Sequence, residues 1–287
     1  MVRSEKPKAE SSPDEEIARM EQAGFNPGKH GFDQIPILAV GRGWMVADKP
    51  AGMSIHNAPG EDLCSLVSEK VRQRPDIGEL FGIDPPNTGF GADIHPVHRL
   101  DRETSGVVLL AADREIFRFF SKQFTSRTVI KTYVALVHGR LEMPGGADSW
   151  GIWEWPLSKT AAGRSRPQGV GRRHPSSTRY RVLGHSEHYT MVSLELLTGR
   201  THQIRRHAKL AGHPVVGDVR YGSDRAVNFL RKQRGFDRLA LHARALSIQL
   251  PGKDDQTTIE TRTIPNQMRI LFEEDWIGRE EATKEQQ

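Results

Sequence analysis

The sequence contains one cysteine, Cys64, among its 287 residues. A single cysteine excludes an intramolecular disulfide and a zinc site built from cysteine ligands. Because Cys64 falls in an amphipathic segment, we expect a buried structural thiol rather than a nucleophile.

Long apolar runs are also missing. No stretch is long enough to span a bilayer, and the first residues, MVRSEKPKAESSPDEE, lack the apolar core of a secretory signal. We therefore predict a cytoplasmic protein without membrane contact. The sequence carries no mark of an oligomeric state, and a monomer is the default expectation.

The excess of positive charge is small over the whole chain but large in one segment. Lys and Arg number 41 against 36 Asp and Glu, which gives a formal net charge of +5. Residues 159–181, expected to form a long basic loop, contain no acid, and their cations are Lys159, Arg164, Arg166, Arg172, Arg173, Arg179 and Arg181. Such a segment favours a polyanionic partner and salt-sensitive binding. The alternative is a solvated loop whose charge only aids solubility.

The spacing of apolar residues predicts more strands than helices. Strands are expected at 37–40, 44–48, 107–112, 129–137, 180–183, 189–197 and 239–250. Helices are expected at 62–73, 113–124, 201–210 (with Thr201 as N-cap) and 224–234, and residues 75–91 are predicted to be loop. Because the strand connections are expected to be mostly antiparallel, we predict an α+β fold with a mixed, largely antiparallel central sheet. One domain, 31–277, is expected between a flexible tail at 1–30, with a weak helix from Ser12, and a charged tail at 278–287.

The segment Ile94–Ala111 places charged side chains directly before a short apolar run. Asp101 lies between Arg99 and Arg102, and the run that follows is predicted to be a buried strand. A loop held by a core strand positions a reactive group well, and neighbouring guanidiniums keep a carboxylate ionised. Taken alone, an Asp between two Arg residues is more often an ordinary loop ion pair.

Three stretches, in order along the chain, carry a resemblance to a known family. They are His98-Arg99-Leu100-Asp101-Arg102-Glu103-Thr104-Ser105-Gly106, Lys131-Thr132-Tyr133, and Thr198-Gly199-Arg200-Thr201-His202-Gln203-Ile204-Arg205, the last extended by Gly212-His213-Pro214 and Gly217-Asp218. Weaker matches are Lys49-Pro50-Ala51-Gly52 and Leu241-His242-Ala243. Over residues 35–250 the sequence resembles the RluA family of RNA pseudouridine synthases.

The resemblance implies a catalytic cleft across a central sheet and the isomerisation of specific uridines in structured RNA, either tRNA or rRNA, to pseudouridine. Asp101 would be the catalytic nucleophile or base; attack on the sugar, attack on the base and abstraction of a sugar proton all stay open. Arg205 would hold Asp101 ionised, and Tyr133 would stack on the target uracil; the alternatives are a surface arginine and a core tyrosine. The reaction is redox-neutral and no dinucleotide or phosphate-loop fingerprint is present, so we expect no cofactor and no metal.

RNA contacts are expected from the catalytic domain itself, since the tail at 1–30 is too short for a separate RNA-binding module. The segment 159–181 is our candidate substitute. Arg99 would fill the gap left by a flipped base, or pair with a phosphate or an acid. The RNA-binding candidates are Arg99, Arg102, Lys131, Arg200, His202 and Arg206, the last a hint of a tRNA-type subgroup. Of Trp150, Trp153 and Trp155, at least two should pack in the core rather than stack on bases.

Two other functions stay open at this stage. Asp93, His95, His98 and Asp101 have the residue types of a zinc or manganese site in a phosphohydrolase or nuclease, but no second His/Asp cluster completes a two-metal centre. A non-catalytic RNA-binding protein would explain the basic segment but not the three motifs together. Metal analysis and the variant Asp101→Asn separate these hypotheses.

Overall fold

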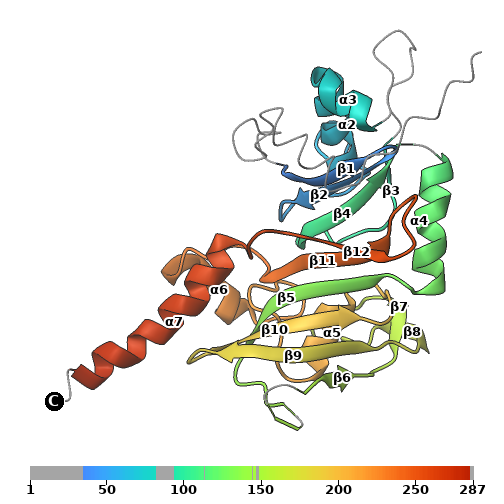
Figure 1. The fold of residues 1–287 in the computed structure, drawn as a ribbon. Helices are drawn as coiled ribbons and strands as arrows, with labels where there is room; N and C mark the ends of the chain where they lie inside the picture. Colours follow the sequence, from blue (N-terminus) through green and yellow to red (C-terminus); the bar gives the residue numbers. More distant parts are fainter. Residues whose placement is uncertain (1–34, 82–93, 113, 144, 147–148, 285–287) are drawn as a thin grey trace, which may run out of the picture.

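The computed structural model describes residues 35–81, 94–112, 114–143, 145–146 and 149–284 (Figure 1). A ten-stranded sheet dominates the described chain. Along the sheet the order is β1 (Ile37–Gly41), β2 (Trp44–Lys49), β4 (Ser105–Ala111), β11 (Leu241–Gln249), β5 (Ile130–His138), β10 (Tyr189–Leu196), β9 (Thr178–His185) and β6 (Gly151–Trp153). In addition, β3 (His95–Pro96) pairs with β4, and β12 (Gln256–Glu260) pairs with β11.

The pairings in the described sheet are antiparallel, except that β11 runs parallel to β4. The predicted α+β fold with a mixed, largely antiparallel sheet is therefore confirmed. Helices flank the sheet in Figure 1 and are α2 (Leu63–Gln73), α3 (Pro75–Phe81), α4 (Arg114–Ser126), α5 (Gln203–Leu210), α6 (Asp224–Gln233) and α7 (Asn266–Lys284).

Strand β4 lies at the centre of the fold because both of its faces are apolar. Each residue of β4 is buried. Val108 and Leu110 belong to one core cluster, which includes residues of α2, whereas Val107 and Leu109 belong to a second cluster with Phe120 of α4. A strand buried on both faces shows no polar alternation. Asp101 lies in the loop that enters this rigid strand.

Helix α2 agrees with the predicted helix at 62–73. Helix α2 begins after Asp62, whose carboxylate accepts a hydrogen bond of 2.8 Å from the backbone N–H of Ser65, as an N-cap does. Cys64 of α2 is half-buried, and burial, with a smaller contribution from Asp62, raises the pKa of its thiol to about 12. A thiol with this pKa stays protonated and is a poor nucleophile.

Four local predictions were wrong. Helix α3 occupies the first part of the predicted loop 75–91, and α7 continues to Lys284 through the predicted tail. Helix α5 follows His202, which has a left-handed backbone (φ 52°), so Thr201 is not its N-cap. The basic segment 159–181 is not a loop: it includes most of the hairpin β7 (Leu157–Thr160) and β8 (Val170–His174) and enters β9.

Some expectations fall outside the described residues, namely the tail at 1–30 with its weak helix from Ser12, and residues 82–91 of the predicted loop. Within the described ranges, no helix has the length and apolar character needed to cross a membrane.

Candidate active site

A cavity of about 310 Å³ brings the three sequence motifs together. Asp101 lines it from the loop before β4, Tyr133 from β5, and Arg205 from α5. Its wall also includes Arg99, Lys131, Arg200 and His202. Asp101 and Tyr133 share one cavity because β4 and β5 are both neighbours of β11 in the sheet, and α5 adds Arg205 to the same cavity.

The Asp101 carboxylate faces two nitrogen-bearing side chains. Arg205 Nη1 lies 3.6 Å from Oδ2, and His202 Nε2 lies 3.8 Å from Oδ1. The side chain of Asp101 is 20% exposed, so it is shielded yet reachable from the cavity. Burial lowers the pKa of His202, which outweighs the opposing effect of Asp101. Arg205 is therefore the permanent cation next to Asp101.

Arg205 is held by a second carboxylate, that of Asp218. Nε and Nη2 of Arg205 each donate to Asp218 over 2.8 Å, a bidentate pair, while Nη1 donates to Glu103 over 3.2 Å. Arg205 is 1% and Asp218 0% exposed, whereas Glu103 is 44% exposed. Burial acts to lower the pKa of Arg205, but its bonds to Asp218 outweigh that effect and raise it. The guanidinium stays charged and fixed in orientation.

Asp218 is itself fixed by the turn that carries it. Its Oδ1 accepts hydrogen bonds from the backbone N–H groups of Arg220 at 2.9 Å and Tyr221 at 3.0 Å. The sequence showed Asp218 only as part of a family match and gave it no role. Asp218 and Arg205 are 13 positions apart in the sequence, which matches neither the helical nor the strand repeat. Their pairing could therefore not be predicted from periodicity.

Tyr133 and Lys131 confirm the expected alternation along β5, since both line the cavity. Tyr133 is buried, and burial, with a smaller effect from Asp101, raises the pKa of its phenol. Burial lowers the pKa of Lys131. At neutral pH the phenol is thus a neutral aromatic surface beside Asp101.

His98 supports the loop rather than reacting. Its Nε2 accepts a hydrogen bond of 3.0 Å from the backbone N–H of Leu109, and its ring stacks on Phe124 at 5.0 Å between centroids. Burial lowers the pKa of His98 to about 3, so the ring is neutral. Because Nε2 is already engaged by β4, that nitrogen is not free for the metal site considered above. Among the described residues, no three His, Cys, Asp or Glu side chains are arranged to hold a metal ion, and Asp93 lies outside those residues.

A family model described as RNA pseudouridylate synthase matches residues 43–210, a range that contains Asp101, Tyr133 and Arg205. The chain belongs to this family. Asp218 lies beyond the matched range, so its role rests on the geometry alone.

Relatives in the RNA pseudouridylate synthase family differ in the RNA that their names specify. The chain is 34% identical over 214 residues to ribosomal large subunit pseudouridine synthase C of Vibrio parahaemolyticus, covering 74% of this chain and 60% of that relative. It is 33% identical over 241 residues to tRNA pseudouridine synthase C of Haemophilus ducreyi, covering 78% and 89%. The solved structure of human RNA Pseudouridylate Synthase Domain Containing 1 has the same fold, with a TM-score of 0.61 at 24% identity over 82% of this chain and 85% of that one.

The weaker family matches form the support beneath the Asp101 loop. The buried Lys49 ammonium donates to the carbonyl oxygens of Pro50, Met53 and Arg102 over 2.8 to 3.1 Å. Arg102 completes the link, because its Nε donates to the Gly52 carbonyl over 2.8 Å. Arg102 does not line the cavity, so its predicted RNA contact would have to use its exposed outer side.

A hydrogen-bond chain ties the start of β4 to β11. Ser105 Oγ lies 2.8 Å from His242 Nδ1, and His242 Nε2 lies 2.9 Å from Thr261 Oγ1. Gly106 has a left-handed φ of 115°, and a side chain there would collide with the backbone of Ala243. The absence of a side chain at Gly106 therefore lets β4 and β11 approach closely at the start of β4, next to the Asp101 loop.

The prediction that Arg206 binds RNA is contradicted by the structure. Arg206 is completely buried, and its guanidinium donates to the carbonyl oxygens of Ser158 and Thr201 at 3.0 and 3.1 Å and to those of Pro167 and Gln168 at 2.5 Å. It therefore anchors the β7–β8 hairpin on α5 and has no surface left for a phosphate.

Proposed function

We propose that the chain is an RNA pseudouridine synthase that isomerises uridine in structured RNA, tRNA or rRNA, without a cofactor. The observation that carries this proposal is the shielded Asp101 carboxylate, which faces Arg205 and Tyr133 in one cavity. The names of the relatives specify both classes of RNA, so neither class is favoured by similarity.

In the proposed reaction the bond between uracil N1 and the ribose breaks and a bond from C5 to the same ribose carbon forms. The C5 proton is lost and N1 gains a proton, so the product is an isomer of the substrate. Asp101 acts as nucleophile or base in this sequence, and its ionised form is maintained by Arg205. The raised pKa of Tyr133 favours a role as a stacking surface for the uracil over proton abstraction.

The cavity contains an unsatisfied donor that fits a nucleic-acid ligand. Among the described residues, Arg200 Nε is a buried side-chain polar atom without a hydrogen-bond partner, while Arg200 Nη2 reaches only the Pro175 carbonyl at 3.5 Å. A buried donor left unpaired costs free energy, on the order of 1–3 kcal/mol. A small movement of the Arg200 side chain toward the cavity would let a substrate oxygen satisfy it. We assign RNA contacts to Arg200 and also to Arg99, Lys131 and His202, which line the same cavity.

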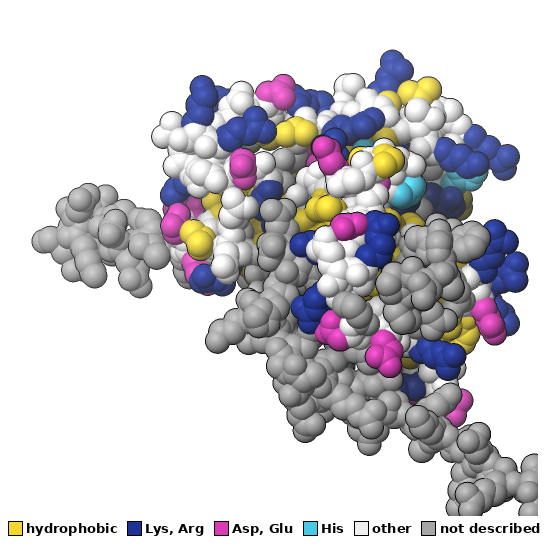
Figure 2. All heavy atoms as spheres, turned by 90° about the horizontal axis from the view of Figure 1, so that it is seen from above, with side chains coloured by type: hydrophobic (Ala, Val, Ile, Leu, Met, Phe, Trp, Pro, Cys, Tyr) yellow, Lys and Arg dark blue, Asp and Glu magenta, His cyan; other side chains and the backbone are white. Residues whose placement is uncertain are grey.

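Outside the cavity, the exposed cations of the β7–β8 hairpin fit a polyanion. Figure 2 shows Lys and Arg side chains recurring over one face of the described molecule, with Asp, Glu and hydrophobic side chains between them. The β7–β8 hairpin exposes Lys159, Arg172 and Arg173. Trp153 is buried against Tyr180, but Trp150 lies beneath the Arg179 guanidinium at 4.5 Å. We assign the hairpin to RNA phosphate contacts, which carry affinity but no sequence information.

Tritium release from RNA labelled at uridine C5 tests the proposal. Transcripts of tRNA and of rRNA are offered separately to the wild type and to Asp101→Asn, each with and without a chelator. Release by the wild type alone, insensitive to the chelator, supports the proposal, and the responding transcript identifies the RNA class. RNA binding without release from either pool supports the non-catalytic alternative, and chelator-sensitive cleavage supports the metal-dependent one. Size-exclusion chromatography tests the predicted monomer.

A further inference from the structure

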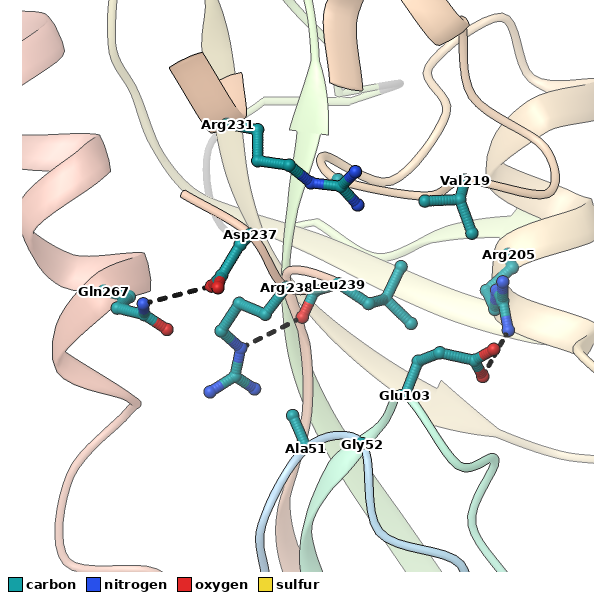
Figure 3. Close-up of a pocket in the computed structure, with 11 residues that line it drawn as sticks. Ala51, Gly52, Glu103, Arg205, Val219, Arg231, Asp237, Arg238, Leu239 and Gln267 are labelled. Carbon is teal, nitrogen blue, oxygen red and sulfur yellow. Dashed lines mark hydrogen bonds and ion pairs between the residues drawn. The ribbon is translucent and has the colours of Figure 1, made fainter. Parts of the chain in front are cut away.

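A second, larger cavity of about 530 Å³ lies on the other side of Arg205. Figure 3 shows its walls: Arg231 of α6 reaches in opposite the turn at Ala51 and Gly52, Arg238 lies on one side, and Glu103 and Arg205 lie on the other. Arg205 also lines the cavity of Asp101. An occupant of the second cavity would therefore be separated from the reacting group by one side chain.

The second cavity has cations without acid partners. Arg231 makes no hydrogen bond or ion pair with another residue in the described part of the chain, and its side chain extends into the cavity in Figure 3. Arg238 is half-buried and donates to Ser105 Oγ and to the Leu239 carbonyl, but it has no carboxylate within 4.0 Å among the described residues. Asp48 and Asp237 act on Arg238 only at longer range.

The acids of this cavity are already occupied. Glu103 pairs with Arg205 at 3.2 Å, and Asp237 accepts a hydrogen bond of 3.4 Å from Gln267. Three guanidiniums and two carboxylates line the cavity, and Arg205 is already paired with Glu103 and Asp218. Asp237 acts on Arg238, so Arg231 is the cation of this lining without an acid partner among the described residues. Guanidinium groups bind phosphate through two parallel N–H donors, so the arrangement suits one phosphate between them.

We propose that this cavity binds a backbone phosphate of the RNA strand that carries the reacting uridine. The proposal rests on the proposed function, and it adds a binding site that sets the position of the strand. A nucleotide next to the target is covalently tied to it, so its phosphate is the anion available at high local concentration across Arg205. Such a contact fixes the register of the uridine over Asp101 without reading a base.

Three variants test the site. Arg231→Gln removes one free cation, and Val219→Trp fills the rim of the cavity, where the half-exposed Val219 lies, without changing charge. Arg225→Gln is the matched control, because Arg225 is an exposed arginine on the same helix that does not line the cavity. Affinity for total tRNA and for the transcript that responds in the tritium assay is measured from 50 to 200 mM salt, a range where phosphate contacts are resolved.

We expect Arg231→Gln to weaken RNA binding roughly tenfold and to reduce the slope of log affinity against log salt by about 0.7–0.9, with KM affected more than kcat. Val219→Trp should weaken binding to a similar degree, and Arg225→Gln should change neither quantity to that extent. Equal effects of Arg231→Gln and Arg225→Gln would mean a diffuse surface field, and loss in Arg231→Gln without loss in Val219→Trp would place the contact outside the cavity. Either result overturns the proposal.

Two further measurements distinguish an RNA phosphate from a free anion, and distinguish failure of this proposal from failure of the proposed function. Binding of inorganic phosphate or uridine monophosphate that Arg231→Gln abolishes, with an unchanged RNA salt slope, would identify a free-anion site and overturn the RNA proposal. If the wild type releases no tritium from any transcript, the proposed function fails, but the salt slopes on total tRNA still decide whether this cavity holds an RNA phosphate.

Discussion

Replacing Asp218 with Asn tests whether the buried pair with Arg205 organises the site. The substitution keeps the size of the side chain, and its remaining oxygen can still accept from the backbone N–H groups of Arg220 and Tyr221. The new amide nitrogen, however, faces a guanidinium donor where a carboxylate oxygen accepted a 2.8 Å hydrogen bond. The perturbation is therefore local to one ion pair.

The expected cost follows from burial. Arg205 and Asp218 are 1% and 0% exposed, so water cannot replace the lost carboxylate. Breaking a buried pair by removing one partner costs about 3–5 kcal/mol. Arg205 is then drawn toward Glu103 and Asp101, its remaining carboxylates at 3.2 and 3.6 Å. A displacement of about 1 Å from the productive position lowers kcat roughly 10²-fold.

The assay is urea unfolding followed by far-UV circular dichroism, together with kcat on the responding transcript under conditions where the variant is folded. Glu103→Gln is the matched control, since Glu103 pairs with the same guanidinium but is 44% exposed. We expect the control to lose no more than about 1 kcal/mol of unfolding free energy. A loss below about 1 kcal/mol in Asp218→Asn with unchanged kcat would refute the reasoning.

Three further predictions concern the supports of the site. Arg206→Met should speed proteolysis within residues 157–174 and raise the Kd for RNA, with partial rescue in Arg206→Lys; unchanged proteolysis would contradict the anchoring role. Gly106→Ala should destabilise the fold by more than about 2 kcal/mol in thermal melts, because its side chain meets the backbone of β11 at a left-handed φ. Burial lowers the pKa of His242 to about 3, so the unfolded chain, with a pKa near 6.5, binds more protons between these values and stability falls as the pH drops below 6.5. His242→Asn should flatten the pH dependence of unfolding free energy between pH 4 and 6 by about 1.4 kcal/mol per unit; the raised pKa of Asp48, about 6, acts in the opposite sense in both proteins and cancels.

The position of the Asp101 loop before a buried strand could be predicted from the sequence because the signals of that strand are local. Burial on both faces fixes the position of the apolar strand β4. The loop that precedes β4 is covalently joined to the strand, so its position is fixed as well. The alternation of Lys131 and Tyr133 along β5 follows from strand geometry alone. These features depend on neighbours in sequence, which is the information that periodicity carries.

The opposite fates of Arg205 and Arg206 show where sequence reasoning ends. Consecutive residues of a helix point about 100° apart, so the two guanidiniums leave α5 in different directions. Arg205 meets Asp218 in the site, whereas Arg206 meets the carbonyl groups of the hairpin. Their partners lie 13 and 48 positions away in sequence, and charge and spacing do not distinguish them. The hairpin was missed for a related reason: its strands are polar and mostly exposed, so they show no apolar alternation.

The charges around Arg205 suggest that the uracil and the phosphates of the RNA bind in different places. One guanidinium faces three carboxylates, those of Asp101, Glu103 and Asp218, so this cluster carries an excess of negative charge. A uracil ring is neutral and enters without repulsion, but a phosphate in the same place would be repelled. The phosphates must therefore be held away from Asp101 by cations that are not already paired with these acids. Among the described residues, Arg200 at the first cavity and Arg231 at the second have no ion pair with a carboxylate and fit that requirement.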